Sequence, residues 1–141
     1  MRRLLPLLLL LIWACTEEDT VPDIAACAYQ SAGDTSAIAA ALLGTWEWQY
    51  AAGGRTGYTS TELGKGIALV FTADRRLEVY RTDSLLVATT WQLETVGPFD
   101  TYLRTGEFLE WTQGPVQHCP PDRLRFFAGA LDGVSHYYLK Q

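Results

Sequence analysis

From residue 45 onward, apolar and polar side chains alternate with a period of two over several short runs. In residues 45–50, for example, Trp46, Trp48 and Tyr50 fall on one face and the polar side chains on the other. Alternation of this kind is typical of half-buried β-strands. Segments rich in glycine, proline or aspartate separate the runs and predict turns. The pattern predicts eight strands, at residues 45–50, 66–71, 76–81, 85–94, 100–104, 107–111, 123–127 and 134–139.

The connections between these strands predict how they are arranged. Each strand is joined to the next by a turn or loop, and no pattern of helix length lies between them. We expect 100–104 to pair with 107–111 across Thr105 and Gly106, and 113–121 to form a long connection. Such a series of hairpins predicts an up-and-down meander, and closure into a barrel removes its exposed edges. The fold class is therefore all-β, with a small eight-stranded barrel.

A short helix is predicted ahead of the strands. Asp34 or Thr35 is suited to cap its N-terminus, alanines and leucines favour helix between them and Gly44, and glycine is a natural terminator. The apolar side chains of this helix are placed to close one end of the barrel; they are Ile38, Leu42 and Leu43.

The N-terminal segment has the composition of a signal peptide. Two arginines precede residues 4–13, an apolar run of roughly ten residues, whereas a membrane-spanning helix needs about 20. The run ends in Leu11-Ile12-Trp13-Ala14-Cys15, which resembles the lipobox of bacterial lipoproteins. The resemblance implies cleavage after residue 14, lipidation of Cys15, and firm anchoring by several acyl chains.

The chain after Cys15 leaves two interpretations of its destination open. Residues 17–19 are acidic and form either a flexible tether or, by resemblance to Bacteroidota lipoproteins, a surface-export signal. Under both interpretations we expect attachment to the outer membrane, on its periplasmic face or at the cell surface, because Thr16 is not the aspartate that signals inner-membrane retention in some Gram-negative bacteria. The organisation is a signal peptide over 1–14, a lipidated cysteine and tether over 15–33, and a barrel domain over 34–141.

If Cys15 carries lipid, two cysteines remain, and in an exported protein such a distant pair predicts a disulfide between Cys27 and Cys119. The alternative is a metal site that joins Cys119 with His118 and His136. Zinc sites usually place their ligands in close pairs such as C-x-x-C, and the sequence contains no such pair. We therefore expect no metal.

The charge of the chain excludes one class of partner. Without residues 1–14 the chain keeps nine basic and 16 acidic residues, a formal charge of −7. A domain of this charge repels phosphate groups, and no basic stripe with interleaved aromatic residues is present. We expect no nucleic-acid partner.

The junction of helix and first strand carries a family resemblance. Leu43-Gly44-Thr45-Trp46 resembles the opening G-x-W motif of lipocalins, and the chain looks most like the small lipocalin-like lipoproteins of Bacteroidota. This resemblance implies that Gly44 and Trp46 form a structural motif at the closed end of the barrel. It also implies that a basic residue from late in the chain packs on Trp46, with candidates Arg123, Arg125 and Lys140.

The functional expectation is a binding module. Aromatic residues predicted to face inward are candidates for contact with a small apolar or amphipathic ligand, with ordinary core packing as the alternative; they are Trp48, Tyr50, Phe71, Trp91 and Trp111. A second hypothesis is a protein-binding module, either an inhibitor or an accessory subunit of a surface complex, with a filled barrel. His118 and His136 have no nucleophile in a recognised catalytic setting nearby, so we expect neither catalysis nor a cofactor.

Overall fold

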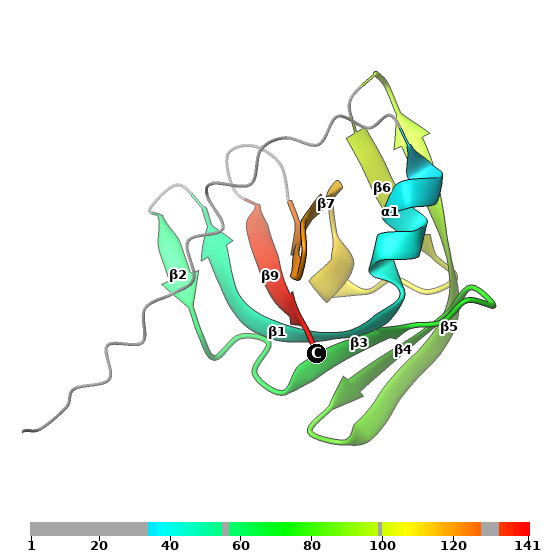
Figure 1. Cartoon of the computed structure of the whole chain (residues 1–141). Helices are drawn as coiled ribbons and strands as arrows, with labels where there is room; N and C mark the ends of the chain where they lie inside the picture. Colours follow the sequence, from blue (N-terminus) through cyan, green and yellow to red (C-terminus); the bar gives the residue numbers. More distant parts are fainter. Residues whose placement is uncertain (1–33, 55–56, 99, 128–132) are drawn as a thin grey trace, which may run out of the picture.

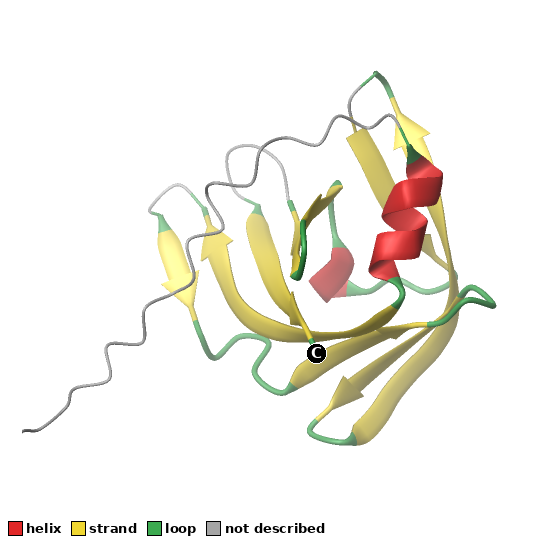
Figure 2. Ribbon diagram, viewed as in Figure 1, coloured by secondary structure: helices red, strands yellow, loops and turns green. Residues whose placement is uncertain are grey.

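The computed structural model describes residues 34–54, 57–98, 100–127 and 133–141, and within them the chain is mostly antiparallel β-structure (Figure 2). One short helix precedes the strands, and a 3-10 turn lies between the sixth and seventh of them. The elements are α1 (Thr35–Leu42), β1 (Gly44–Gly53), β2 (Tyr58–Ser60), β3 (Ile67–Phe71), β4 (Arg76–Arg81), β5 (Ser84–Val96), β6 (Asp100–Thr105), η1 (Glu110–Thr112), β7 (Val116–Cys119), β8 (Arg123–Phe126) and β9 (Val134–Lys140).

The strands form a nearly closed, up-and-down barrel. Neighbouring strands follow the order β6-β5-β4-β3-β1-β9-β8-β7, and the short β2 pairs with the end of β1 outside this path. The long β1 curves between β3 and β9 and so joins the two halves of the barrel (Figure 1). At the ends of the order, β6 and β7 meet at an isolated bridge between Tyr102 and Pro115. The predicted eight-stranded barrel is confirmed, and it has a seam between β6 and β7.

Helix α1 covers one end of this barrel, close to β5 and β7 (Figure 1). Asp34 caps it by accepting hydrogen bonds from the backbone N–H groups of Ser36 at 3.0 Å and Ala37 at 3.1 Å. The Ser36 hydroxyl and these two amides hold the pKa of Asp34 below its ordinary value. Leu42 is fully buried at the other end of the helix, so the helix plugs the barrel as its sequence predicts.

The core follows from the alternation along the strands. In β3 every second residue is buried, and β4 continues the same inner layer. In β5, Trp91 is 2% exposed, and Val87 and Leu93 pack against the core from the same face. The largest side chains that are completely or almost completely buried are Trp46, Tyr138, Phe71, Phe126, Leu42, Ile67, Leu69, Leu77, Leu124 and Val79. The inner face of the barrel is therefore lined by large apolar side chains that pack against one another.

Two strand predictions between residues 105 and 121 are wrong. Residues 107–111, predicted as a strand, form a loop that leads into η1, and β6 pairs with β5 rather than with this segment. The buried Leu109 draws the chain inward here, and its carbonyl accepts from the N–H of Thr112 at 3.2 Å. The strand that completes the barrel is instead β7, which lies inside the predicted long connection. It has only four residues and is flanked by prolines, so the sequence pattern does not reveal it.

The predicted common face of Trp46, Trp48 and Tyr50 is also wrong for its last member. A β-bulge shifts the pairing of β1 with β9 between Trp48 and Tyr50. After the bulge, Ala51 belongs to the main core, whereas Tyr50 stacks on Tyr137 with ring centroids 4.3 Å apart. Neighbouring residues of a strand point to opposite faces, so the one extra residue turns Tyr50 to the outside of the barrel.

Candidate binding site

The closed end of the barrel is built around Trp46. Its indole N–H donates to the carbonyl of Leu42 at 2.7 Å, and its ring is fully buried. The ammonium group of Lys140 lies 5.2 Å from the ring centroid and donates to the carbonyl of Ala41 at 3.0 Å. Of the three basic candidates, Lys140 is therefore the residue on Trp46, and it also satisfies one of the carbonyls left unpaired at the end of α1.

Gly44 is part of the same closed end. Its φ of +115° lies in the region that side chains disfavour, and a Cβ there would come within 3.2 Å of Lys140 Cε. The imidazole of His118 stands edge-on to Trp46 with ring centroids 6.0 Å apart. These contacts lock helix, first strand and last strand together, so this end has a structural role.

Four of the five predicted ligand-contacting aromatics are at least 94% buried. Trp48, Phe71 and Trp91 belong to the main core, and Phe71 meets Trp91 edge-on at 5.4 Å. Tyr50 lies on the outer face. Trp111 is partly buried in η1, where its carbonyl accepts from the hydroxyl of Tyr138 at 2.9 Å. The structure brings three of these residues into one packed layer rather than around an open space.

A second buried tryptophan lies two residues farther along β1. Trp48 donates its indole N–H to His136 Nδ1 at 3.1 Å, and both residues are at least 95% buried. This contact requires the neutral imidazole with its proton on Nε2. Burial lowers the pKa of His136, which keeps the ring neutral near pH 7.

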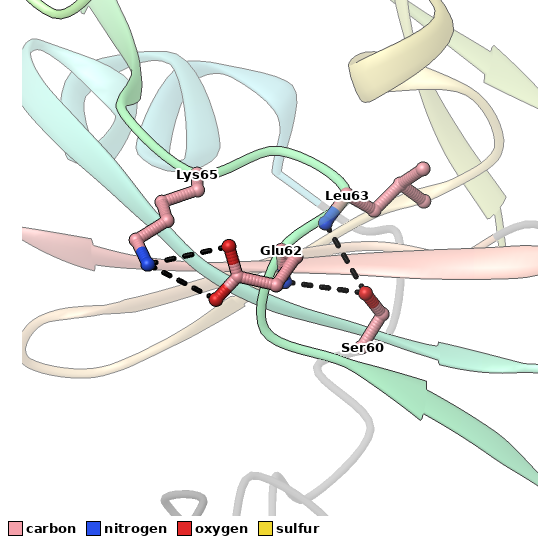
Figure 3. A network of polar contacts seen from close by, with 4 residues as sticks. All are labelled: Ser60, Glu62, Leu63 and Lys65. Atoms are coloured by element: carbon pink, nitrogen blue, oxygen red, sulfur yellow. Dashed lines mark hydrogen bonds and ion pairs between the residues drawn. The ribbon is translucent and has the colours of Figure 1, made fainter.

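The loop of residues 60–66 covers Trp48. A Cβ on Gly64 would lie 2.6 Å from the indole ring, so the loop backbone presses directly on it. Figure 3 shows how the loop is held: the Ser60 hydroxyl accepts from the N–H groups of Glu62 and Leu63, and Glu62 pairs with Lys65 at 3.0 Å. Because both charged side chains are about 70% exposed, the ion pair adds little stability, and the glycine–indole contact determines the fit.

A hollow formed by described residues lies at the seam. It has a volume of about 370 Å³ and is bounded by the second half of β6 on one side and by the end of η1 on the other. Phe108 stands at its rim with 80% of its surface exposed, the most exposed of the large apolar side chains described. The lining residues are Tyr102, Leu103, Arg104, Thr105, Gly106, Glu107, Phe108, Thr112, Gln113 and Gly114.

A smaller hollow of about 250 Å³ adjoins the first and shares Arg104, Thr105 and Gly106 with it. Arg104 forms an ion pair with Glu94 on β5, and its guanidinium lies 5.3 Å from the ring centroid of Tyr102. Trp91 also borders this hollow, and its buried indole N–H has no hydrogen-bond partner within the described residues. The combined surface of the two hollows therefore offers neutral hydrogen-bonding groups, an arginine whose charge is balanced by Glu94, and the exposed ring of Phe108.

The outer face of the barrel carries the only described cysteine. Cys119 is 7% exposed, packs with Tyr50 and is disulfide-bonded. Nearby, Arg125 donates to the side-chain oxygen of Gln117 and lies over the rings of Phe127 and Tyr137. Cys15 and Cys27 lie outside the described residues, so lipidation of the first and pairing of the second with Cys119 stay predictions.

The residues of the seam hollow were missed by the sequence analysis. Phe108 falls in the predicted strand 107–111, where an apolar residue next to the polar Glu107 is expected to face the core. The sequence does contain one indication of this site: Phe108 follows directly after Gly106 and Glu107, and the residues after 111 are predicted as a long connection rather than as a strand that could cover it. Which strand flanks it follows only from the closure of the barrel.

No protein-family model, curated protein or solved structure matches this chain. In the described residues, no helix is long and apolar enough to cross a membrane, and no cluster of three or more histidine, cysteine or acidic side chains is arranged to hold a metal ion.

Proposed function

We propose that this protein is an exported lipoprotein, anchored to the outer membrane through Cys15, whose barrel is a non-catalytic binding module for an amphipathic molecule. The lipobox-like segment 11–15 supports export and anchoring. One observation carries the binding part of the proposal: a seam hollow with an exposed aromatic residue lies beside a barrel whose inner aromatics are already packed.

The size and lining of the hollow favour this kind of ligand. Its volume of about 370 Å³ is at the small end of the range for ligand sites. Leu103 and Phe108 offer apolar contact, whereas Thr105, Thr112 and Gln113 carry hydrogen-bonding groups. A ligand with one apolar and one neutral polar part matches this surface better than a purely apolar one.

The anchor is tested by metabolic labelling with a fatty acid in a host that processes lipoproteins. Cys15→Ala is expected to abolish labelling, because the thiol is the proposed attachment point. Labelling that persists in the Cys15→Ala chain contradicts the anchor.

The binding site is tested by native mass spectrometry of residues 20–141, produced in an oxidising periplasm without detergent. An added discrete mass of a few hundred daltons that Phe108→Ala loses supports the seam hollow. Val96→Ala is the matched control, because Val96 is also an exposed apolar residue, 42% exposed, but does not line either hollow. A bound mass that is unaffected by Phe108→Ala contradicts the assigned site.

A further inference from the structure

The register of β6 determines which of its backbone groups face the seam. The N–H of Gly106 donates to the carbonyl of Thr90 on β5 at 3.2 Å. In an antiparallel pair, alternate residues exchange hydrogen bonds with the partner strand and the residues between them point away. Arg104 and Tyr102 therefore bond toward β5, and the amide groups of Leu103 and Thr105 point toward the seam.

The β5 side of the pair agrees with this register. Trp91, which lies opposite Thr105, donates its backbone N–H at 2.9 Å to Arg75, away from β6. Thr105 is thus a non-bonded position of the pair, and its own N–H and C=O are available on the free side of β6.

The far side of the seam does not supply partners along the whole edge. The bridge of Tyr102 with Pro115 joins the two sides near the middle of β6. Beyond it the sides separate around the 370 Å³ hollow, with Thr105 on one wall and residues 112–114 on the other. Within the described residues, no backbone hydrogen bond crosses from Thr105 to that wall. At Thr105, beyond this bridge, the edge of β6 is open.

We propose that this edge binds an extended peptide segment of a partner protein, which adds a short strand to β6 beside Thr105. The inference rests on the proposed function, because it uses the same hollow, and it names the chemical class of the target. Main-chain N–H and C=O groups of an extended peptide match those of a strand edge, as in other cases of strand addition.

The hollow and its rim match the side chains of such a segment. Successive side chains of a strand alternate in direction, about 3.3 Å apart along it. One side chain then enters the hollow against Leu103 and Thr112, and the next lies outside near Phe108. Since Arg104 is paired with Glu94 and the lining also holds Glu107, no excess positive charge favours an anion such as a lipid phosphate.

Thr105→Pro tests the inference directly. Proline removes the N–H that faces the seam, and a proline at an edge position whose N–H is not in the ladder leaves the sheet intact. Thr105→Val keeps the N–H and removes the hydroxyl, which donates to the carbonyl of Glu107. This variant therefore measures how much the side chain contributes to the affinity for the peptide.

The probe is a phage-displayed library of random dodecapeptides, selected on the full lipidated chain in lipid nanodiscs. Enriched peptides are synthesised with capped ends, and their affinities are measured by fluorescence anisotropy. We expect at least a tenfold loss of affinity in Thr105→Pro and less than a threefold loss in Thr105→Val. Hydrogen exchange at the Thr105 amide is expected to slow on binding, which a purely structural effect of the proline does not mimic.

Two results overturn the inference. One is the absence of any enriched peptide. The other is an enriched peptide that binds the folded Thr105→Pro chain as tightly as the parent. A small molecule that binds the hollow, loses affinity in Phe108→Ala and is unaffected by Thr105→Pro refutes strand addition and leaves the proposed function standing. If neither Phe108→Ala nor Thr105→Pro weakens any bound peptide or small molecule, both proposals fail.

Discussion

Two buried tryptophans of β1 lie only two residues apart in the same core, yet their surroundings are built differently. Trp46 donates to a backbone carbonyl and is held by Lys140, from the last strand. Trp48 donates to the titratable imidazole of His136 and is covered by the loop of residues 60–66. The first tryptophan is fixed by a backbone carbonyl and by a cation from the last strand. The second depends on a neutral histidine and on one glycine.

The range of the contacts differs as well. At the α1 end, Lys140 reaches Ala41 across 99 positions of the chain. In the loop over Trp48, the side-chain contacts join residues two or three positions apart, and one longer-range hydrogen bond runs from the N–H of Thr82 to the carbonyl of Gly66 at 2.9 Å. Short-range contacts form without the rest of the fold, so they tie a loop to the barrel only weakly. The loop over Trp48 is therefore expected to open at a lower free energy than the α1 end of the barrel.

The largest expected effect is at Trp46. Trp46→Ala removes a fully buried ring and leaves the carbonyl of Leu42 without its donor. We expect a loss of about 3–5 kcal/mol in the free energy of unfolding, measured by urea denaturation. Trp46→Phe, which keeps a ring but not the N–H, serves as the control and is expected to lose less. Equal losses in the two variants contradict a dominant role for the buried ring.

Gly64→Ala is expected to have the next largest effect. Its Cβ meets the Trp48 indole at 2.6 Å, and overpacking of this kind costs about 1–3 kcal/mol. The shift in indole packing is expected to change the tryptophan fluorescence as well. The matched control is Leu63→Ala in the same loop, where the side chain is 50% exposed and its loss costs little. An unchanged melting temperature in Gly64→Ala means that the loop does not press on Trp48.

Lys140→Met is expected to cost about 1–2 kcal/mol. The variant keeps most of the aliphatic stem over Trp46 but loses the hydrogen bond to Ala41 and the attraction between cation and ring. Arg125→Met is the comparison, since Arg125 was an equal candidate from sequence and contacts Gln117 on the outer face. A larger loss of stability in Arg125→Met than in Lys140→Met contradicts the proposed role of Lys140 in stabilising the closed end.

The smallest effect is expected from pH, and it involves a histidine beside each of the two tryptophans. Because burial lowers the pKa of His136, the unfolded chain takes up the proton first as the pH falls below about 6.5. The stability that His136 maintains is therefore fully present above pH 6.5. It is lost as the pH falls toward the lowered folded pKa, by at most about 1.4 kcal/mol per pH unit.

Urea titrations at pH 7 and pH 5 measure this loss. His136→Gln is expected to flatten the dependence, and the part that remains belongs in the main to His118, whose pKa is also lowered by burial. A wild-type chain equally stable at both pH values contradicts the role of the neutral imidazole.

Local patterns predicted the fold well where a strand and its neighbour in sequence are also neighbours in space. The strands around residues 67–71 and 76–81 and the capped helix are confirmed, because alternation, turn residues and capping act over a few positions. The segment 107–111 shows where this reasoning fails. Its alternation is equally compatible with a loop that buries one residue, Leu109, and exposes the next.

The candidate site was predicted less well. The aromatic residues were identified correctly as large inward groups in three cases, but whether they form a pocket or a packed layer depends on how they meet across the barrel. Tyr50 was placed on the wrong face because a bulge of one residue cannot be read from alternation.

The sequence by itself determined that the chain forms an all-β barrel preceded by a capped helix, because the period of its apolar residues and its turn and capping residues act locally. Only the tertiary structure decided that Lys140 lies on Trp46, that His136 accepts from Trp48, and that β6 and β7 leave a seam with Phe108 at its rim. The physical reason is that these features depend on which distant strands close the barrel, and that closure is a property of the whole chain rather than of any segment.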